Sequence, residues 1–277
     1  MKFICSLYYR NKMSDTYDHW EAGTLKSKAK KLFYQICWHT VHLFYPKIDV
    51  EGTDNLPQEP SIVVGNHSQI HGPIFSELYF PGKRVIWCAG EMMHMKEVPD
   101  YAYHDFWEEK PQWLKPMYRL LSYLIAPFAS TVMRCADTIA VYRDTRIMST
   151  FRHTIEKLCD GCHIIVFPEC KQGYNQILCR FQENFVDVAK LYYKQTGKEL
   201  EFVPMYLAPE LRKAYFGTPI RYCHNNPISQ ERSRICRELM EEITRIAVSL
   251  PEHTVVPYPN ISKKQYPKNT SSEAILP

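Results

Sequence analysis

The most restrictive feature of the sequence is an alternation of short apolar runs and longer amphipathic segments between residues 47 and 250. The short runs are rich in Val and Ile, as buried strands are, whereas the longer segments repeat apolar residues every three or four positions, as helices do. The predicted strands are 61–64, 85–89, 138–142, 163–167 and 202–207, and the predicted helices begin at Gly72-Pro73 and cover 116–128, 146–158, 181–194 and 229–250. This order predicts an α/β fold with a mainly parallel sheet flanked by helices.

Composition and charge exclude several classes of protein. Of the 277 residues, 45% are hydrophobic and 23% charged, which predicts a folded chain. A net charge of +4, without an Arg/Lys stripe interleaved with aromatics, argues against a nucleic-acid partner. The ten cysteines have no regular spacing, so we expect reduced thiols. The pair Cys159 and Cys162 lacks the further ligands of a zinc site, so we expect no metal.

The two ends of the chain differ in composition from the middle. Residues 1–23 are polar and irregular and predict a mobile arm, and residues 251–277 are rich in Pro, Ser and Lys and predict a disordered tail. Residues 24–46 predict an amphipathic helix with four lysines in its opening turns. Two interpretations remain open for its apolar face, namely contact with a membrane interface and packing on the domain.

The same chain contains no apolar run near the ~20 residues that a spanning helix needs, and its first residues lack the pattern of a secretory signal. We therefore expect a protein that is peripheral to the cytoplasmic face of a membrane.

Polar residues that could take part in catalysis or binding follow several of the predicted strands. His67 follows the strand 61–64, Arg143 follows 138–142, and Glu169 follows 163–167. Because ligands of α/β sheets bind outside the carboxyl ends of the strands, we expect these side chains to share one edge. A histidine suits general-base work near neutral pH, and an arginine suits a phosphate or a carboxylate.

Four short blocks, taken in order, carry a resemblance to a known family. They are Asn66-His67, residues 139–143 (IAVYR), residues 166–169 (VFPE) and Val203-Pro204. In order and spacing they resemble the four blocks of the glycerolipid acyltransferase family, which includes the 1-acylglycerol-3-phosphate acyltransferases. The resemblance extends from about Gly52 to Leu250 and implies an acyltransferase-like domain over residues 47–250.

The resemblance also implies a reaction. A fatty acyl group would pass from acyl-CoA or an acyl-carrier protein to a lysophospholipid or a similar amphiphilic acceptor, with no cofactor and no covalent acyl-enzyme. His67 would be the general base. Asn66, Arg143, Glu169 and Lys171 would bind the substrate, and a membrane lipid surface would be a partner. Such transfer belongs to phospholipid biosynthesis.

The sequence departs from the family pattern at two places. The family has an Asp five residues after the histidine, and this chain has Gly72 there. The candidates to orient His67 instead are His71, a carboxylate from residues 100–105, a backbone oxygen and a bound water. The third block continues Cys170-Lys171-Gln172, so Lys171 stands near the position of a family arginine. These departures leave two alternatives to the transferase: a catalytically silent lipid-binding relative, and a thioesterase.

Overall fold

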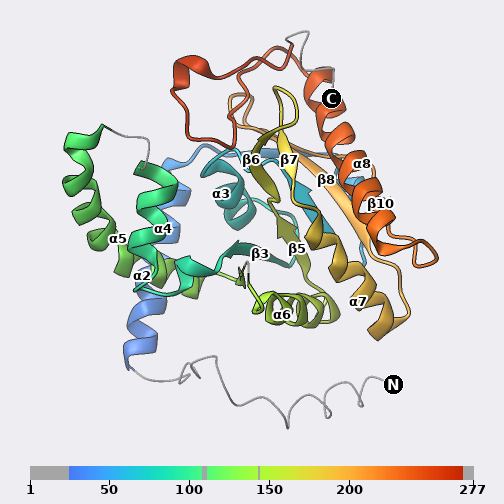
Figure 1. Ribbon diagram of the computed structural model, residues 1–277, viewed down its shortest axis with the longest axis horizontal. Coiled ribbons are helices and arrows are strands. Elements are labelled where there is room, and N and C mark those ends of the chain that lie inside the picture. Colours follow the sequence, from blue (N-terminus) through green and yellow to red (C-terminus); the bar gives the residue numbers. More distant parts are fainter. Residues whose placement is uncertain (1–24, 108–110, 143, 271–277) are drawn as a thin grey trace.

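The structure, a computed structural model, describes residues 25–107, 111–142 and 144–270. It is an α/β fold in which one large sheet has helices on both faces (Figure 1). The strands of this sheet are β1 (Asp49–Glu51), β2 (Ile62–Gly65), β3 (Arg84–Ala89), β4 (Thr138–Val141), β5 (His163–Val166), β8 (Glu201–Ala208), β9 (Lys213–Phe216) and β10 (Ile220–Arg221). A separate hairpin is formed by β6 (Glu169–Gly173) and β7 (Cys179–Phe181).

The centre of the sheet is parallel, as the sequence predicts. Its order is β1-β9-β8-β2-β5-β3-β4, and the pairs β8–β2, β2–β5, β5–β3 and β3–β4 are all parallel. β9 and β10 run antiparallel to β8, and β1 runs parallel to β9. The carboxyl ends of five parallel strands therefore meet at one edge, where the predicted site residues follow β2, β4 and β5.

The main helices are α2 (Leu25–Phe44), α3 (His71–Leu78), α4 (Val98–Ala102), α5 (Lys115–Cys135), α6 (Ile147–Cys159), α7 (Asp187–Thr196) and α8 (Ile228–Ser249). Short turns of other helix types are η1 (Thr53–Asn55), η2 (Gly90–Met93), η3 (Tyr103–Trp107), η4 (Gln112–Leu114), η5 (Glu183–Val186) and η6 (Lys263–Gln265). The helix predicted over 181–194 begins late, because Phe181 is buried as the last residue of β7 and pairs with Glu169. Among the residues that the structure describes, no helix combines the length and apolarity needed to cross a membrane.

Alternating residues of the central strands enter two separate cores. On one face, Ile62, Val64 and Ile164 pack with buried residues of α6, α7 and α8. On the other face, Val63 and Ile165 pack in the cluster that contains residues of α3. Burial of both faces explains why the strands read as continuous apolar runs in the sequence.

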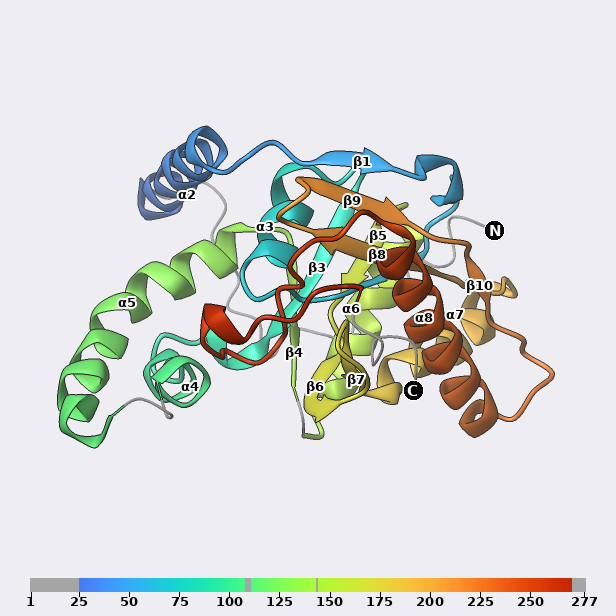
Figure 2. The ribbon, with the colours of Figure 1, turned by 90° about the horizontal axis from the view of Figure 1, so that it is seen from above.

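α2 and α5 lie side by side at one end of the molecule, beyond β4 and α3 (Figure 2). The Phe33 and Phe128 rings meet edge to face, with centroids 5.8 Å apart. α2 is also tied to α3, because the Tyr34 hydroxyl donates to the Glu77 carboxylate. Part of the α2 surface therefore packs on the domain, which is one of the two interpretations of its apolar face.

Residues 251–270, which we call the C-terminal strap, differ from the sequence prediction of a disordered tail. The strap is folded onto the sheet domain, and it crosses above α3 in Figure 1. His253 and Asn269 are fully buried, and the Asn269 Nδ2 donates to the Ala247 carbonyl at 2.8 Å. The difference arises because buried polar anchors, which composition does not reveal, hold the strap in place.

Candidate active site

The turn after β2 carries His67 and is fixed from its first residue. Asn66 is buried, and its side chain bonds both backbone groups of Leu207 on β8: Nδ2 donates to the carbonyl at 3.0 Å, and Oδ1 accepts from the amide at 2.7 Å. Asn66 Nδ2 also donates to the Ser68 hydroxyl at 2.7 Å. The structure thus places Asn66 in the backbone framework of the turn, and a role in substrate binding remains a prediction.

The turn continues through two residues with unusual backbone angles. Ser68 and Gln69 have φ values of 45° and 55°, in the left-handed region that non-glycine residues rarely occupy. Such residues cost on the order of 1–3 kcal/mol each and persist where the surroundings hold them, often at functional sites. Here the surrounding bonds come from Asn66 and from the Gly72 amide, which donates to the His67 carbonyl at 3.0 Å.

The carboxylate of Glu169 binds the backbone of this turn. It begins β6 and is only 4% exposed. One carboxylate oxygen accepts from the His67 amide at 2.6 Å, and the other accepts from the Cys179 amide at 2.9 Å. The sequence brings His67 and Glu169 to one edge, and the structure joins them through the His67 backbone. Binding of an acceptor by Glu169 remains a prediction, since both oxygens already hold amides of the chain.

The burial of Glu169 changes its acidity. Burial raises the pKa of its carboxyl from the usual 4.5 to about 7, and the hydrogen bonds from His67 and Cys179 oppose this rise. The two amides stabilise the charged form, but the removal of water has the larger effect. Glu169 therefore changes its charge close to neutral pH, beside the candidate base.

The imidazole of His67 is half-buried and contacts two aromatic rings. The Phe167 ring, which follows β5, lies with its centroid 5.2 Å away, at an interplanar angle of 61°. The Tyr258 ring, from the C-terminal strap, lies 5.6 Å away at 66°. The contact with Tyr258 was not foreseen, because no pattern in residues 251–277 marks this tyrosine out.

Gly72 is the residue that replaces the family Asp, and the structure shows why a side chain does not fit there. A Cβ on Gly72 would lie 2.6 Å from the His67 carbonyl oxygen and 2.8 Å from the Phe167 ring. Both distances are below those that real Cβ atoms show, and one of the neighbours is backbone. An orienting carboxylate at position 72 is therefore excluded sterically in this arrangement.

The other residues predicted for the site have different surroundings. Lys171 is exposed on β6. Arg143 lies outside the described residues, so its predicted role stays a prediction. Of the candidates to orient His67, His71 has its Nδ1 2.8 Å from the Tyr45 hydroxyl, and Asp100 pairs with Arg119 at 3.3 Å.

Two surface hollows are found elsewhere on the molecule. One, of about 330 Å³, lies between α2 and α5. The other, of about 640 Å³, includes Tyr192 and His224, and neither is lined by His67. Within the described ranges, no group of three or more His, Cys, Asp or Glu side chains is arranged to hold a metal ion.

Comparisons with known proteins give a limited result. No family model and no curated protein matches the chain. Among solved structures, the chain is similar to the 1-acyl-sn-glycerophosphate (LPA) acyltransferase PlsC from Thermotoga maritima, with 18% sequence identity and a TM-score of 0.38. The match covers 77% of this chain and 78% of that chain. At this TM-score, the overlap assigns neither a family nor an activity to the chain.

The packing around Gly72 leads to a first prediction. We expect Gly72→Ala to lower the free energy of unfolding by roughly 1–3 kcal/mol, because the methyl group overpacks the space beside Phe167. Gly72→Asp should destabilise at least as much and should not increase activity. Urea denaturation measures the first effect. Gly173→Ala is the matched control, because nothing lies within 4 Å of a Cβ there; equal stability of both variants would contradict the packing argument.

The acidity of Glu169 leads to a second prediction. Its pKa in the folded chain, about 7, is above the usual 4.5, so between these values the folded state binds a proton that the unfolded state has released. The contribution of Glu169 to stability is therefore largest below about pH 4.5 and falls as the pH rises to about 7, by on the order of 3 kcal/mol in total.

The measurement is the free energy of unfolding from pH 5 to 8, compared between the parent and Glu169→Gln. The comparison is needed because burial lowers the pKa of His71 and His163, which changes stability with pH in the opposite sense. We expect the free energy of unfolding of Glu169→Gln to rise relative to that of the parent as the pH rises. A difference that is constant with pH would show that Glu169 does not titrate in this range.

Proposed function

We propose that this chain is an acyltransferase that uses His67 to move a fatty acyl group from a thioester to an amphiphilic acceptor. The observation that carries the proposal is the position of His67, at the carboxyl edge of the sheet in a strained turn held by the buried Glu169 carboxylate. A backbone fixed in this way suits a residue with a chemical role better than one that only fills space. The four ordered sequence blocks supply the reaction class.

The proposed chemistry is a single acyl transfer. His67 takes the proton of the acceptor hydroxyl while the acceptor oxygen forms a bond to the thioester carbonyl carbon. The carbon–sulfur bond then breaks, and the departing thiolate receives the proton from the imidazolium. The products are an acylated acceptor and a free thiol. The donor is acyl-CoA or an acyl-carrier protein, and the acceptor is a lysophospholipid or a related amphiphile.

Both substrates of such a reaction favour a lipid surface, and one end of the molecule suits it. On α5 and the turn before it, large apolar side chains are turned to solvent: Trp113 is 78% exposed, Leu120 62% and Leu124 66%. On α2, Ile36 and Phe44 are 56% and 79% exposed. Large exposed apolar patches mark interaction sites. We propose that this α2/α5 face rests on the cytoplasmic surface of a membrane, with the protein peripheral to it.

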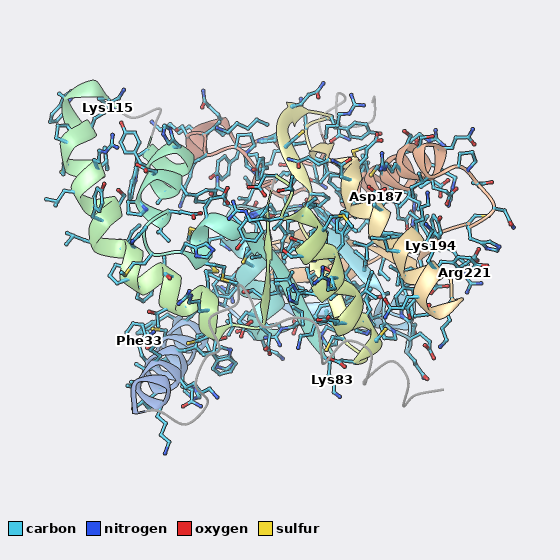
Figure 3. All side chains as sticks on the ribbon, turned by 60° about the horizontal axis from the view of Figure 1, so that its bottom comes forward. Phe33, Lys83, Lys115, Asp187, Lys194 and Arg221 are labelled. Atoms are coloured by element: carbon cyan, nitrogen blue, oxygen red, sulfur yellow. The ribbon has the colours of Figure 1, made fainter. Side chains whose placement is uncertain are left out.

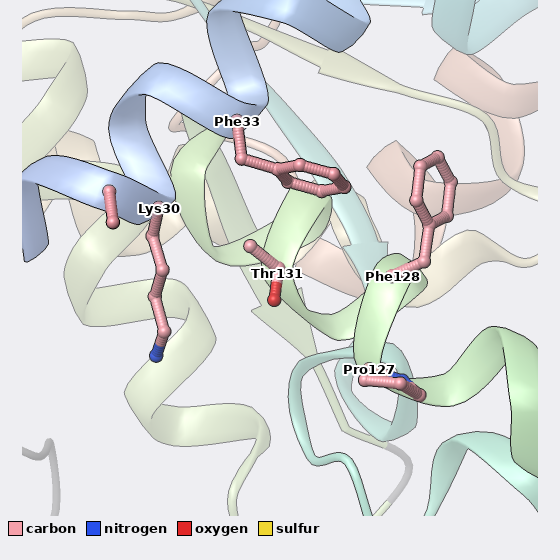
Figure 4. A pocket seen from close by; sticks show the side chains of 6 residues that line it. Lys30, Phe33, Pro127, Phe128 and Thr131 are labelled. Carbon is pink, nitrogen blue, oxygen red and sulfur yellow. The ribbon is translucent and has the colours of Figure 1, made fainter. Parts of the chain in front are cut away.

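The charges of the two helices indicate which kind of surface they meet. Neither α2 nor α5 contains an acidic residue, and their charged side chains are all basic. Figure 3 labels Lys115 at one end of α5 and Phe33 on α2 near the other end. Figure 4 shows Lys30, Phe33 and Phe128 around the hollow between the two helices. An apolar face with basic residues and no carboxylates complements an anionic bilayer.

A third prediction tests the catalytic assignment. We expect His67→Ala to lower acyl transfer by roughly 10²–10⁴-fold, the usual contribution of a general base, without loss of the fold. The assay offers labelled acyl-CoA or acyl-carrier protein with a panel of lysophospholipids and amphiphilic alcohols, and lipid analysis of expressing cells extends the panel. His224→Ala is the control, because this histidine pairs with Glu199 at the hollow away from the site.

The outcomes separate the three candidate functions. Acylated acceptor in the parent but not in His67→Ala supports the proposal. Thioester cleavage without an acylated acceptor would replace it by a thioesterase. Lipid binding without any turnover in the parent would replace it by the catalytically silent relative that the Gly72 substitution favours. Equal turnover in the parent and in His67→Ala would remove His67 from the mechanism.

A fourth prediction tests the membrane surface. We expect the protein to float with vesicles that contain phosphatidylserine, and to do so less with added salt. Changing the four lysines of residues 26–31 to Gln should reduce vesicle binding at least about tenfold, since each is worth roughly 1 kcal/mol at an anionic surface. The double substitution Leu120→Ser and Leu124→Ser should reduce it on neutral vesicles as well.

The matched control changes Lys190 and Lys194 of α7 to Gln. Both are exposed, and Lys194 is on the side of the molecule away from Lys115 in Figure 3. This variant should bind vesicles as the parent does. Equal binding by all variants, or a stable dimer in sedimentation that is lost in the Leu120/Leu124 variant, would show that this face serves another purpose.

A further inference from the structure

The C-terminal strap is anchored at both of its ends. At its beginning, the buried His253 ring has its Nε2 2.8 Å from the Tyr206 hydroxyl of β8. At its end, Asn269 accepts from the His253 amide at 2.8 Å and donates to the Ala247 carbonyl near the end of α8. Between these anchors, Val255 donates to the Pro267 carbonyl at 2.9 Å. Residues 256–266 therefore form a closed loop on a rigid base.

This loop lies on the turn that carries His67. The Gln69 Nε2 donates to the Tyr266 hydroxyl at 2.8 Å and approaches the Pro259 carbonyl at 3.5 Å. Tyr258 faces the His67 imidazole, with ring centroids 5.6 Å apart. Burial and, to a lesser degree, the charge of Lys263 in the η6 turn lower the pKa of His71. Tyr258, Pro259 and Tyr266 of the strap thus all approach residues of the turn.

Phe167 provides the second aromatic ring that contacts the imidazole. Its ring is 5.2 Å from that of His67, and it also occupies the space that a side chain at position 72 would need. Residue 72 therefore offers no group to orient His67. Edge-to-face contacts between aromatic rings fix relative orientation and are worth about 0.5–1.5 kcal/mol beyond the buried area.

We propose that Tyr258 is a positioning residue for His67, so that the strap supplies from outside the sheet the orientation that position 72 is unable to supply. The imidazole contacts the rings of both Phe167 and Tyr258, and the anchors of the strap fix the position of Tyr258. A base held in this way needs no carboxylate partner at position 72. The consequence for turnover rests on the proposed acyl transfer, whereas the consequence for the geometry of the imidazole does not.

The test compares Tyr258→Ala, which removes the ring, with Tyr258→Phe, which keeps it. The first readout is NMR of histidine-labelled protein, with the His67 resonances assigned by His67→Ala. In Tyr258→Ala the His67 ring resonances should move by more than the lost Tyr258 ring current accounts for, and the contacts between the His67 and Phe167 ring protons should weaken. In Tyr258→Phe both should stay near those of the parent. Tyr258→Leu keeps bulk without an aromatic ring and is used if Tyr258→Ala unfolds. Tyr266→Phe is the control, because it removes the hydrogen bond between Gln69 and the Tyr266 hydroxyl but leaves the ring contact between Tyr258 and His67.

The second readout is kinetic. We expect Tyr258→Ala to lower kcat roughly ten- to hundredfold with little change in KM, as a displaced catalytic group does, and Tyr258→Phe to stay within a few-fold of the parent. Unchanged His67 resonances and unchanged kcat in Tyr258→Ala would overturn the proposal, even where His67→Ala abolishes transfer. An equal loss in Tyr258→Phe would also overturn it, because the ring would not be the part that acts.

The two proposals fail in different ways. If His67→Ala keeps the activity of the parent, the proposed function fails, and the NMR comparison alone decides the role of Tyr258. If His67→Ala is inactive and the His67 resonances respond to Tyr258→Ala but not to Tyr258→Phe, both proposals stand.

Discussion

The buried carboxylate of Glu169 connects the two strands on which the candidate site is built. It joins the turn after β2 to the hairpin after β5 by accepting one backbone amide from each side. His67 lies in the turn after β2 and Cys179 begins β7, and a buried amide left without an acceptor costs about 1–3 kcal/mol. The position of His67 therefore depends on a residue that need not touch any substrate.

The same hydrogen bonds hold the turn after β2 in its strained conformation. Ser68 and Gln69 remain in the left-handed region because Asn66 ties the turn to β8 on one side and Glu169 ties it to β6 on the other. Since the pKa of Glu169 is raised to about 7, the strength of one of these ties changes near neutral pH. In such a site, the charge of the buried Glu169 carboxylate is coupled to the geometry of the candidate base through the His67 backbone amide.

Much of the sheet, but less of the site, was predictable from the sequence. The central strands were predictable because burial on both faces requires unbroken apolar runs, such as 61–64 and 163–167. The β6–β7 hairpin was not, because β6 is mostly exposed and polar after the buried Glu169, and β7 is only three residues long. Sequence order placed His67 and Glu169 at one edge. It did not reveal the tight space beside Gly72, which depends on the packing of Phe167.

The strap was missed for a related reason, since its order comes from His253 and Asn269, polar residues that composition assigns to loops. Because both residues follow α8 in the sequence, the strap is synthesised after the sheet. Asn269 closes the strap, so the surroundings of His67 are completed only after residue 269 has left the ribosome. The sheet can form earlier, because its last strand precedes α8. A chain interrupted during translation before residue 251 would thus contain every strand of the sheet that the structure describes and yet lack Tyr258, so its candidate site would be unfinished.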